Sequence, residues 1–487
     1  MLKTLEILCE GLVEIEAGHK QLEVFGISAD SRLIKPGFLF AALPGTLVDG
    51  AKFIGQAIDN GAVAVVVSNA VKVDVPENVA VLRTDQPRAV LARLAARFFV
   101  DQPDCVAAVT GTNGKSSVVA FVRQMWQAMG IRAASLGTVG IDHPDGFEKL
   151  EHTTPDPVAL HESLARLAQN GVDHLALEAS SHGLEQNRLD GINICVGAFT
   201  NFSQDHLDYH KTFEAYFAAK MRLFDDLLCP GCAAVINADS DEADKVIAHV
   251  RAHGVRVFTV GEKGRDLKLL EQTELGLGQL LKIKGHERTY KVYLPLVGKF
   301  QASNALVAAG MVIASGGSEA VAVKTFENLK GAKGRLELVD RTQKGAAIFV
   351  DFAHTPAALK LSLEALKPFA EGRLVVVFGC GGDRDKGKRP LMGKVACQMA
   401  DKVYVTDDNP RGEAAGDIRA ETLAGCPDAT EIGDRQKAIA SAIGELQKDD
   451  VLLIAGKGHE EGQIVGNKVM PFSDHTAVRL VIEGKAA

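Results

Sequence analysis

The sequence predicts an α/β protein in which mostly parallel sheets are distributed over three domains. The chain has 487 residues, and one hydrophobic core rarely serves more than about 250–300 residues. Short apolar runs with the length of buried strands alternate with helical patterns over most of the chain, as in parallel sheets. One of these runs leads directly into a glycine-rich turn and a helix, so the turn follows the carboxyl end of a strand.

Composition and charge exclude several classes of protein. Apolar residues make up 46% and charged residues 24%, the balance of an ordinary globular protein. The formal net charge is −8, which argues against a nucleic-acid partner. Apolar runs stay well below the length of a membrane span, and Lys3, Glu6 and Glu10 interrupt any signal-peptide pattern. We therefore expect a cytoplasmic protein with neither nucleic-acid nor membrane partners.

Two further motifs are discounted. The eight cysteines are too sparse for a disulfide scaffold, and the pair Cys229 and Cys232 lacks a second pair to complete a zinc site. Residues 379–384 resemble a dinucleotide-binding fingerprint but end in Arg384 where that fingerprint has glycine, so we expect no NAD site.

The predicted domains are residues 1–102, 103–331 and 332–487. In the first, we expect strands within 37–45 and 62–67 and a helix over 90–99, before Pro103 breaks the pattern. In the second, strands are predicted at 105–109, 175–178, 194–200 and 233–237, with a helix over 117–129. A glycine-rich joint at 329–334 leads to the third, with strands at 347–351, 374–378, 402–405 and 451–454.

The glycine-rich turn at residues 111–116 is a candidate phosphate loop. Backbone N–H groups between a strand and a helix can bind phosphate oxygens. Lys115 would neutralise phosphate charge, and the Ser116 hydroxyl would coordinate Mg²⁺. Val109 stands where the full P-loop pattern has glycine, so the loop is a shortened variant. The alternative is a glycine turn followed by an incidental lysine and serine.

A lysine lies on the apolar face of a second predicted helix, residues 212–224. Thr212 is a suitable N-cap, and the apolar stripe consists of Phe213, Tyr216, Phe217 and Phe224. Lys220 falls on the same stripe, where a lysine must extend its amine to solvent, pair with an anion or be chemically altered. Metal-capable side chains are dense in the preceding residues 201–210, and Glu178 ends a buried strand, a suitable place for a Mg²⁺ ligand.

Taken together, these stretches resemble the Mur ligase family. The resemblance extends over the whole chain in the family's three-domain order. The matching stretches are residues 111–117, 153–155, 178–182, 205–210, Lys220 in its helix, 334–337, 350–356, 381–384, 408–411 and 456–460.

The resemblance implies a central ATP-binding domain with a P-loop and a parallel sheet. It implies an N-terminal α/β domain that binds a UDP-linked substrate and a Rossmann-like C-terminal α/β domain that binds an amino acid. The implied activity is ATP-dependent amide ligation in bacterial peptidoglycan precursor synthesis. Within the family it points to addition of meso-2,6-diaminopimelate to UDP-N-acetylmuramoyl-L-alanyl-D-glutamate through an acyl phosphate. The implied cofactors are ATP and Mg²⁺, and we expect a monomer whose partners are small-molecule substrates.

The resemblance also implies roles for individual residues. Those expected to bind ATP are Gly111, Thr112, Asn113, Gly114, Lys115, Ser116, Ser117, Asn304, Arg335 and Asp351. Those expected to bind the UDP-linked substrate are Ser28, Ser31, Thr153, Thr154, Ser180, Gln186 and Arg188. Those expected to bind diaminopimelate are Arg384, Asp408, Asn409, Pro410, Arg411, Gly456 and Glu460.

The expected catalytic residues are Lys115, Lys220, Glu178 and His206, and the expected metal ligands are Ser116, Glu178, His206 and Lys220. For Lys220 the resemblance implies a carbamate formed with CO₂ (N6-carboxylysine), which turns a cation into an anionic metal ligand. The sequence departs from the family's pattern at three positions, with Ser116 for Thr, Phe352 for Tyr and His152 for Asn.

Specificity for diaminopimelate is expected from residues 408–411, in which an Asn-Pro step favours a tight turn. Arg411 is suited to grip the distal carboxylate of diaminopimelate, with Arg384 beside it and Glu460 taking the ammonium group. The alternative is a surface turn closed by a local pair between Asp408 and Arg411.

Four rival functions remain open. A folylpolyglutamate-type ligase shares the fold and phosphate chemistry, and a second peptidoglycan ligase adds L-lysine in place of diaminopimelate. A P-loop motor or regulatory NTPase and a non-catalytic ATP-binding scaffold belong to other classes. The shortened loop and the set of metal-capable residues disfavour the last two.

Overall fold

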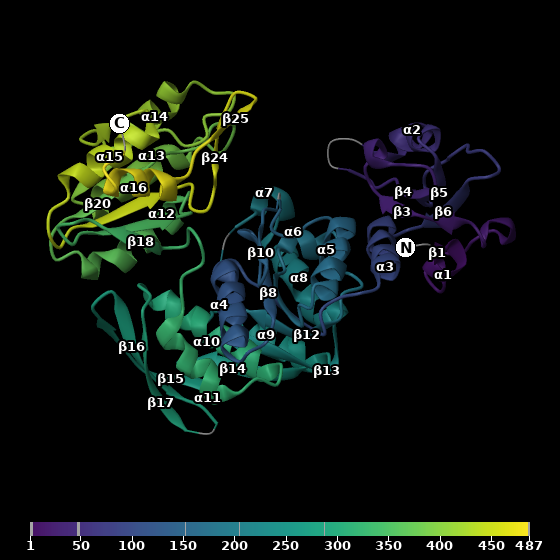
Figure 1. Ribbon diagram of the computed structural model, residues 1–487, viewed down its shortest axis with the longest axis horizontal. Coiled ribbons are helices and arrows are strands. Elements are labelled where there is room, and N and C mark those ends of the chain that lie inside the picture. Colours follow the sequence, from purple (N-terminus) through teal and green to yellow (C-terminus); the bar gives the residue numbers. More distant parts are fainter. Residues whose placement is uncertain (1–2, 46–48, 151, 204, 287, 486–487) are drawn as a thin grey trace. The chain divides into compact units, whose positions relative to one another are not determined.

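The computed structural model describes residues 3–45, 49–150, 152–203, 205–286 and 288–485. Of Leu207 and Asp208, which fall in the metal-capable segment, only the backbone is described, and Gln204 lies outside the described residues. The chain forms two compact units, residues 1–268 with 307–322 and residues 269–306 with 323–487. Each unit is an α/β arrangement (Figure 1).

The first unit begins with a small parallel sheet of strand order β3-β4-β5-β6. Successive residues of β4 and β5 point into two different cores, one shared with helix α3 and the other with α2, so both sheet faces are covered. The elements are β1 (Lys3–Thr4), α1 (Leu5–Cys9), β2 (Glu23–Val24), β3 (Gly26–Ser28), β4 (Phe38–Ala41), α2 (Ile54–Asp59), β5 (Ala62–Ser68), β6 (Ala80–Thr84) and α3 (Pro87–Phe99).

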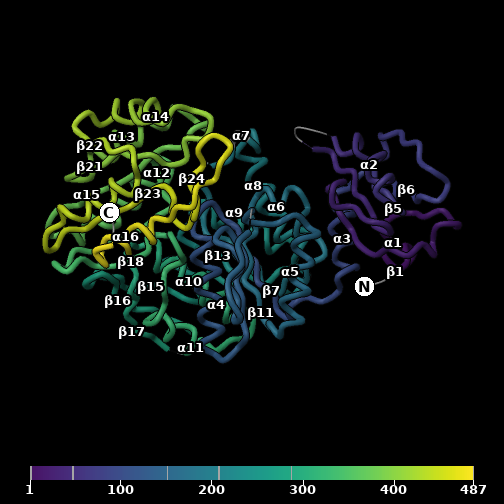
Figure 2. Tube along the Cα trace, turned by 45° about the horizontal axis from the view of Figure 1, so that its top comes forward, coloured from purple at the N-terminus to yellow at the C-terminus, as the bar shows by residue number. Residues whose placement is uncertain are grey.

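A larger sheet follows in the same unit, with the strand order β10-β9-β8-β11-β7-β12-β13-β14. The six strands from β8 to β14 are parallel, whereas β9 and β10 add an antiparallel edge. The course of β11, β7 and β13 through this unit can be followed in Figure 2. The strands are β7 (Cys105–Thr110), β8 (Ala133–Gly137), β9 (Gly140–His143), β10 (Gly146–Glu148), β11 (His174–Glu178), β12 (Ile194–Phe199), β13 (Leu228–Asn237) and β14 (Arg256–Gly261).

Helices cover both faces of this sheet at its centre, since every residue of β7 is buried. Helix α4 packs against β8 and β11, and α6 packs against α8. The helices are α4 (Lys115–Ala128), α5 (Pro157–Gln169), α6 (Ser181–Glu185), α7 (Leu207–His210), α8 (Phe213–Arg222), the π-helical turn η4 (Leu223–Leu227) and α9 (Ala243–Ala252).

The second unit contains an antiparallel hairpin of β16 and β17 and a separate sheet of order β18-β19-β23-β20-β21-β22. That sheet is parallel except for β18, and alternate residues of β19 face two cores lined by helices. Its strands are β18 (Glu337–Arg341), β19 (Ala347–Asp351), β20 (Leu374–Phe378), β21 (Lys402–Val405), β22 (Thr430–Glu431) and β23 (Val451–Ala455).

Five helices flank that sheet, and a small hairpin lies near its carboxyl edge. The helices are α12 (Pro356–Leu366), α13 (Lys388–Met399), α14 (Ala415–Leu423), α15 (Arg435–Glu445) and α16 (Asp474–Ile482). The hairpin is β24 (Gly462–Val465) and β25 (Lys468–Pro471), and the remaining elements are β15 (Leu267–Leu275), β16 (Gly278–Lys284), β17 (Thr289–Leu294), α10 (Lys299–Ala314) and α11 (Glu319–Lys324).

The predicted α/β class and the parallel sheets are confirmed, and the three predicted helices differ in their bounds. Helix α3 begins at Pro87, three residues earlier than expected. Helix α4 begins at Lys115, two residues earlier than expected, because Gly114 occupies the left-handed conformation at its N-cap. Phe213 is 39% exposed and does not belong to the buried stripe, since it is the first helical residue after the N-cap Thr212. The α-helix ends at Arg222 and continues as the π turn rather than as regular helix.

None of the helices in the described part of the chain is long and apolar enough to cross a bilayer. The predicted joint at residues 329–334 contains neither helix nor strand, as expected.

A buried ion pair joins two helices of the second unit. Arg435 at the start of α15 donates to both carboxylate oxygens of Asp474 in α16, at 2.7 and 2.8 Å, and both side chains are fully buried. A second N–H of Arg435 reaches the carbonyl oxygen of Ala455 at the end of β23, 2.9 Å away. The pair therefore ties the loop after β23 to two helices.

Removing one partner of this pair tests its role. Asp474→Ala leaves a buried guanidinium without its counter-charge, and we expect a loss of about 3–5 kcal/mol in the free energy of unfolding. Urea denaturation followed by circular dichroism measures this loss. Glu364→Ala, which removes an exposed partner of Lys360, is the matched control and should change stability by less than about 0.5 kcal/mol. Equal losses of unfolding free energy in the two variants would contradict a stabilising role of the buried ion pair.

Candidate active site

The phosphate-loop candidate connects β7 to α4 and needs glycine at two positions. Gly111 has φ +144° and Gly114 has φ +89°, both in the region that favours glycine. A Cβ at Gly111 would lie 2.0 Å from the hydroxyl of Thr200, so the neighbouring strand end excludes any side chain there. Asn201 closes the loop from the same side, accepting from the N–H of Asn113 at 2.9 Å.

Two lysines converge on this loop. The Lys115 ammonium donates to the carbonyl oxygens of Gly111 and Thr112, each at 2.8 Å. The Lys220 amine donates to the same Gly111 oxygen at 2.8 Å and lies 4.3 Å from the ring centroid of Tyr216. The predicted position of Lys220 on a buried helix face is confirmed, because only 1% of the residue is exposed.

Burial lowers the pKa of Lys220 well below its usual range, the positive charge of Lys115 lowers it further, and Asp205 opposes the shift. A lower pKa increases the fraction of a lysine amine that is neutral and nucleophilic at a given pH. The simple alternative, in which the amine extends to solvent, does not describe this side chain.

A cluster of imidazole and phenol rings lies next to these lysines. The ring of His206 packs edge-on against His182, with centroids 4.9 Å apart, and His182 contacts Tyr209 at 4.1 Å. His206 itself has φ +52° and lies half-exposed before α7. Because His182 belongs to α6, which follows β11, this ring contact places His206 beside the loop between β11 and α6.

Glu178 ends β11 with its carboxylate held in place. Its two oxygens accept from the N–H of Thr138 at 2.8 Å and from the Thr138 hydroxyl at 3.1 Å. Thr138 also contacts the hydroxyl of Thr153, 3.0 Å away. Thr138 was not predicted, because nothing in the residues after β8 marks it as a partner of Glu178.

The structure brings most of the residues expected to bind the UDP-linked substrate into one hydrogen-bonded chain. The Thr154 hydroxyl lies 2.9 Å from that of Ser180, which caps α6. Arg188 donates to the carbonyl oxygen of Thr154 at 2.6 Å and to the amide oxygen of Gln186 at 2.7 Å. The hydroxyl and guanidinium groups are thus pre-positioned at the carboxyl edge of the sheet.

Ser28 and Ser31 lie elsewhere, at the end of β3 in the small parallel sheet. Ser28 accepts from the N–H of Asp30 at 3.0 Å, and Ser31 donates to Gln56 at 2.8 Å. The Ser28 hydroxyl helps to form the turn after β3, whereas that of Ser31 links the following 3-10 turn to α2. The binding role of both residues stays a prediction.

Three residues expected to contact ATP lie in the second unit. Asn304 lies on α10, where its amide is 3.4 Å from Gln301. Asp351 ends β19 and accepts from the N–H groups of Leu336 and Ala353, at 2.6 and 2.9 Å. Arg335 stacks on the ring of Phe352 at 4.8 Å, so phenylalanine serves as a flat platform for the guanidinium.

Residues 408–410 lie buried at the carboxyl end of β21, and the hydrogen-bonded turn of this loop runs from Pro410 to Glu413 rather than over 408–411 as predicted. Arg411, with φ +50°, donates through one nitrogen to the carbonyl oxygen of Gly382 at 2.9 Å. Among the described residues, Nε and Nη2 of Arg411 have no hydrogen-bond partner. The alternative pair between Asp408 and Arg411 is absent from the ion pairs of the described residues, so the guanidinium edge can receive a ligand carboxylate.

Lys457 was missed as a site residue and lies at the centre of this region. Fully buried, it donates to the side chain of Asn409 at 2.9 Å and to the carbonyl oxygen of Gly462 at 2.8 Å, and it lies 3.3 Å from Glu460. Asn409 also donates to the same oxygen of Glu460 at 3.0 Å, which leaves Oε1 of Glu460 for another partner. Lys457 lies within the matching stretch 456–460, so the resemblance could have predicted it as a site residue.

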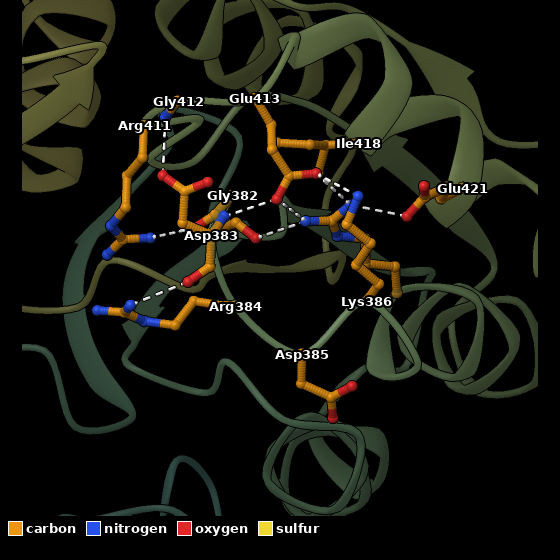
Figure 3. Close-up of polar contacts among 12 residues, drawn as sticks. Gly382, Asp383, Arg384, Asp385, Lys386, Arg411, Gly412, Glu413, Ile418 and Glu421 are labelled. Carbon is orange, nitrogen blue, oxygen red and sulfur yellow. Dashed lines mark hydrogen bonds and ion pairs between the residues drawn. The ribbon is translucent and has the colours of Figure 1, made fainter.

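A second network holds the loop of Arg384 (Figure 3). Buried Arg389 donates to Glu413, at 2.8 and 3.1 Å, and to Glu421 at 2.7 Å. Glu413 accepts in turn from the N–H of Asp383 at 2.6 Å. Hydrogen bonds from Arg389, then from Asp383, lower the pKa of Glu413 to about 2. Figure 3 shows the guanidinium groups of Arg384 and Arg411 on the same side of Asp383.

The chain matches family models along most of its length. They are the Mur ligase family catalytic domain over residues 23–99, the Mur ligase middle domain over 109–312 and the Mur ligase glutamate ligase domain over 334–458. The chain belongs to the Mur ligase family. Its members are ATP-dependent ligases, and the chain is an enzyme of this class.

Individual relatives match over nearly the full length. UDP-N-acetylmuramoyl-L-alanyl-D-glutamate–2,6-diaminopimelate ligase of Bradyrhizobium diazoefficiens is 51% identical over 97% of this chain and 98% of its own. The enzyme of the same name from Agrobacterium fabrum is 51% identical over 94% and 93%. A solved structure of that name is 33% identical, covers 100% of both chains and has a TM-score of 0.73.

The residues of this Mur ligase fit a divalent ion. Ser116 offers a hydroxyl at the start of α4, Glu178 a buried carboxylate and His206 an imidazole beside the same loops. Both oxygens of Glu178 keep a further lone pair after bonding Thr138, so the carboxylate can still coordinate. Oxygen donors of this kind suit Mg²⁺.

Gly111 tests the geometry of the loop. Gly111→Ala introduces a Cβ in collision with Thr200 and displaces the oxygen that receives both lysines. We expect ATP affinity to fall by at least about tenfold, since displacements near 1 Å at a positioned site cost up to about 100-fold. Equilibrium titration with ATP measures this. Gly55→Ala, where a Cβ meets nothing within 4 Å, should bind ATP as wild type does; a matching loss there would contradict the argument.

Proposed function

We propose that the chain adds meso-2,6-diaminopimelate to UDP-N-acetylmuramoyl-L-alanyl-D-glutamate at the expense of ATP. The observation that carries the proposal is the loop of residues 408–411, which presents an unpaired guanidinium edge of Arg411 next to Arg384. Relatives that carry the name of this activity are about half identical over nearly the whole chain, which supports the same substrates here.

The reaction proceeds through an activated carboxylate, because a carboxylate and an amine do not condense in water. The γ-phosphoryl group of ATP passes to the side-chain carboxylate of D-glutamate and gives an acyl phosphate. The amine of diaminopimelate attacks, and the tetrahedral intermediate loses phosphate to leave an amide. The protein contributes positioning and charge neutralisation, for which the loop at residues 111–116 and Lys115 are suited.

Mg²⁺ bound by Ser116, Glu178 and His206 would neutralise phosphate charge. The residues themselves orient the reactants. Thr154, Ser180 and Arg188 present hydroxyl and guanidinium groups to the UDP-linked substrate. Arg335, whose buried Nε has no partner among the described residues, is suited to a phosphate. We further propose that the enzyme acts as a monomer in the bacterial cytoplasm.

Diaminopimelate differs from lysine by a second carboxylate at its far end. In the proposed complex Arg411 and Arg384 bind that carboxylate, and the remaining oxygen of Glu460 accepts from the adjacent ammonium group. Lysine would leave Arg411 desolvated without a counter-charge. This disfavours the rival that adds lysine.

One assay separates the rival functions. ADP release is measured with ATP, Mg²⁺ and UDP-N-acetylmuramoyl-L-alanyl-D-glutamate, with or without meso-diaminopimelate, lysine, or a folate and glutamate. Only the combination with diaminopimelate should release ADP and amide product together, and Lys115→Ala should abolish both. ADP release without an amine acceptor would favour an NTPase, and turnover with folate would favour the folylpolyglutamate-type ligase.

We also propose that Lys220 carries a carbamate in the active enzyme. Its burial, its lowered pKa and the neighbouring Lys115 favour reaction with CO₂, since the carbamate anion gains a counter-charge that the ammonium lacks. The anion would then contribute to the Mg²⁺ site beside Glu178 and His206.

Lys220→Ala tests the carbamate. We expect turnover to fall at least about 100-fold, because the charge that positions the phosphate groups is lost. Small carboxylic acids added to Lys220→Ala should restore part of the activity by supplying the anion, and they should not stimulate Lys115→Ala. Normal turnover of Lys220→Ala, or equal rescue of both variants, would leave the lysine without a carbamate role.

Arg411→Ala tests amino-acid selection. Loss of the guanidinium should weaken the binding of diaminopimelate by about 2–5 kcal/mol, which raises its KM at least about 30-fold. The KM for ATP should stay within about twofold of the wild-type value. Steady-state kinetics with each substrate varied in turn measure this. Arg341→Ala, an exposed arginine of β18, is the control. Equal use of lysine and diaminopimelate by the wild-type enzyme would exclude the loop as the specificity element.

A further inference from the structure

Three potential metal ligands gather in the first unit outside the residues assigned to substrates. They are Asp225 in the π turn η4, His249 in the last turn of α9 and His253 directly after that helix. Their ligand atoms all lie within 4.8 Å of one another. Both η4 and α9 contact β13, so a common strand supports the two elements.

The local structure explains why these side chains meet. His249 and His253 are four residues apart and therefore share one face of the helix, with ring centroids 4.9 Å apart. Asp225 comes from the π turn that follows α8, where one extra residue per turn changes the direction in which side chains point. The carboxylate reaches His249 Nε2 at 2.6 Å and His253 Nδ1 at 3.5 Å.

The separation of 3.5 Å is close to that of two donors on one ion, whereas the 2.6 Å contact is a hydrogen bond that ion binding would have to open. Zinc binds imidazole nitrogen and carboxylate oxygen at about 2.0–2.1 Å, which places tetrahedral donors about 3.3 Å apart. His253 Nδ1 also contacts the carbonyl oxygen of His249 at 2.9 Å. Because a carbonyl only accepts, that nitrogen carries a proton in this contact, and a bound ion would replace the proton.

Nearby cations are engaged with other partners. Arg222 bonds Asp226 at 2.7 Å and Asp190 at 3.2 Å. Lys245, one turn before His249 on α9, lies over the ring of Phe217 at 4.0 Å and pairs with Glu242 at 3.8 Å. The carboxylate of Asp225 therefore faces two imidazoles, and its charge is available to an ion.

We propose that Asp225, His249 and His253 bind one divalent transition-metal ion of the Zn²⁺ type, with water in the fourth position. Two imidazoles and one carboxylate suit zinc and its neighbours in the first transition series far better than they suit Mg²⁺ or Ca²⁺. The ion would link the π turn at the end of α8 to α9. Because α8 carries Lys220, this link would stabilise the helix from outside the substrate sites.

Zinc titration of the full-length protein tests the proposal. The protein is titrated with Zn²⁺ against a chromophoric chelator, with excess Mg²⁺ present to occupy sites that prefer hard ions. Wild type should bind one ion that His249→Ala and Asp225→Asn bind at least about tenfold more weakly. Asp225→Asn keeps a hydrogen-bonding side chain of the same shape, so it guards against misfolding of the histidine variant.

The control variant removes the pair Cys229 and Cys232, two further potential zinc ligands of this unit. The double variant Cys229→Ser/Cys232→Ser should bind the ion as wild type does. Zn²⁺ should raise the melting temperature of the wild type and of this double variant, but not that of His249→Ala. Binding lost with the cysteines and kept by the histidine variant would overturn the proposal. So would a wild type whose zinc affinity and melting temperature equal those of His249→Ala and Asp225→Asn.

Discussion

The carbonyl oxygen of Gly111 is the point on which the first unit's chemistry depends. It accepts from Lys115, which follows it in the loop, and from Lys220, which arrives from α8 more than a hundred residues later. Both amine groups reach one oxygen because the backbone turns at φ +144° and Thr200 excludes a side chain at Gly111. The arrangement brings the positive charge of Lys115 to the loop, and the burial of Lys220 beside it lowers the pKa of that amine.

In the second unit, long polar side chains are held at fixed positions in the loops that follow the strands. Buried cations do this by bonding backbone and side-chain oxygens at once. Arg389 holds the loop of Arg384 through Glu413, Lys457 holds Asn409 and Glu460, and Arg435 holds the end of β23. Each buried charge is balanced, as its desolvation requires. These networks leave other polar groups unused among the described residues, including the guanidinium edge of Arg411.

Much of the fold could be predicted because it rests on local signals. Apolar runs of strand length predicted β7, β19, β20, β21 and β23 within a residue or two, and the N-cap Thr212 was predicted from its type alone. The differences fell at the ends of elements, since β13 begins at Leu228 rather than at residue 233 and α3 at Pro87 rather than at residue 90. Phe213 proved exposed because the first helical turn points away from the core, and the π turn after Arg222 has no sequence signal comparable to a cap.

What the sequence by itself determined is the α/β class, the shortened phosphate loop and the conflict posed by a lysine on an apolar helix face. These depend on spacing along the chain, which periodicity and glycine placement express directly. Only the tertiary structure decided which groups meet across the chain. Thr138 bonds Glu178 from the end of another strand, and Asp225 meets His249 because a π turn redirects it. Such contacts depend on strand order and on the direction of each side chain, and neither quantity is encoded in local spacing.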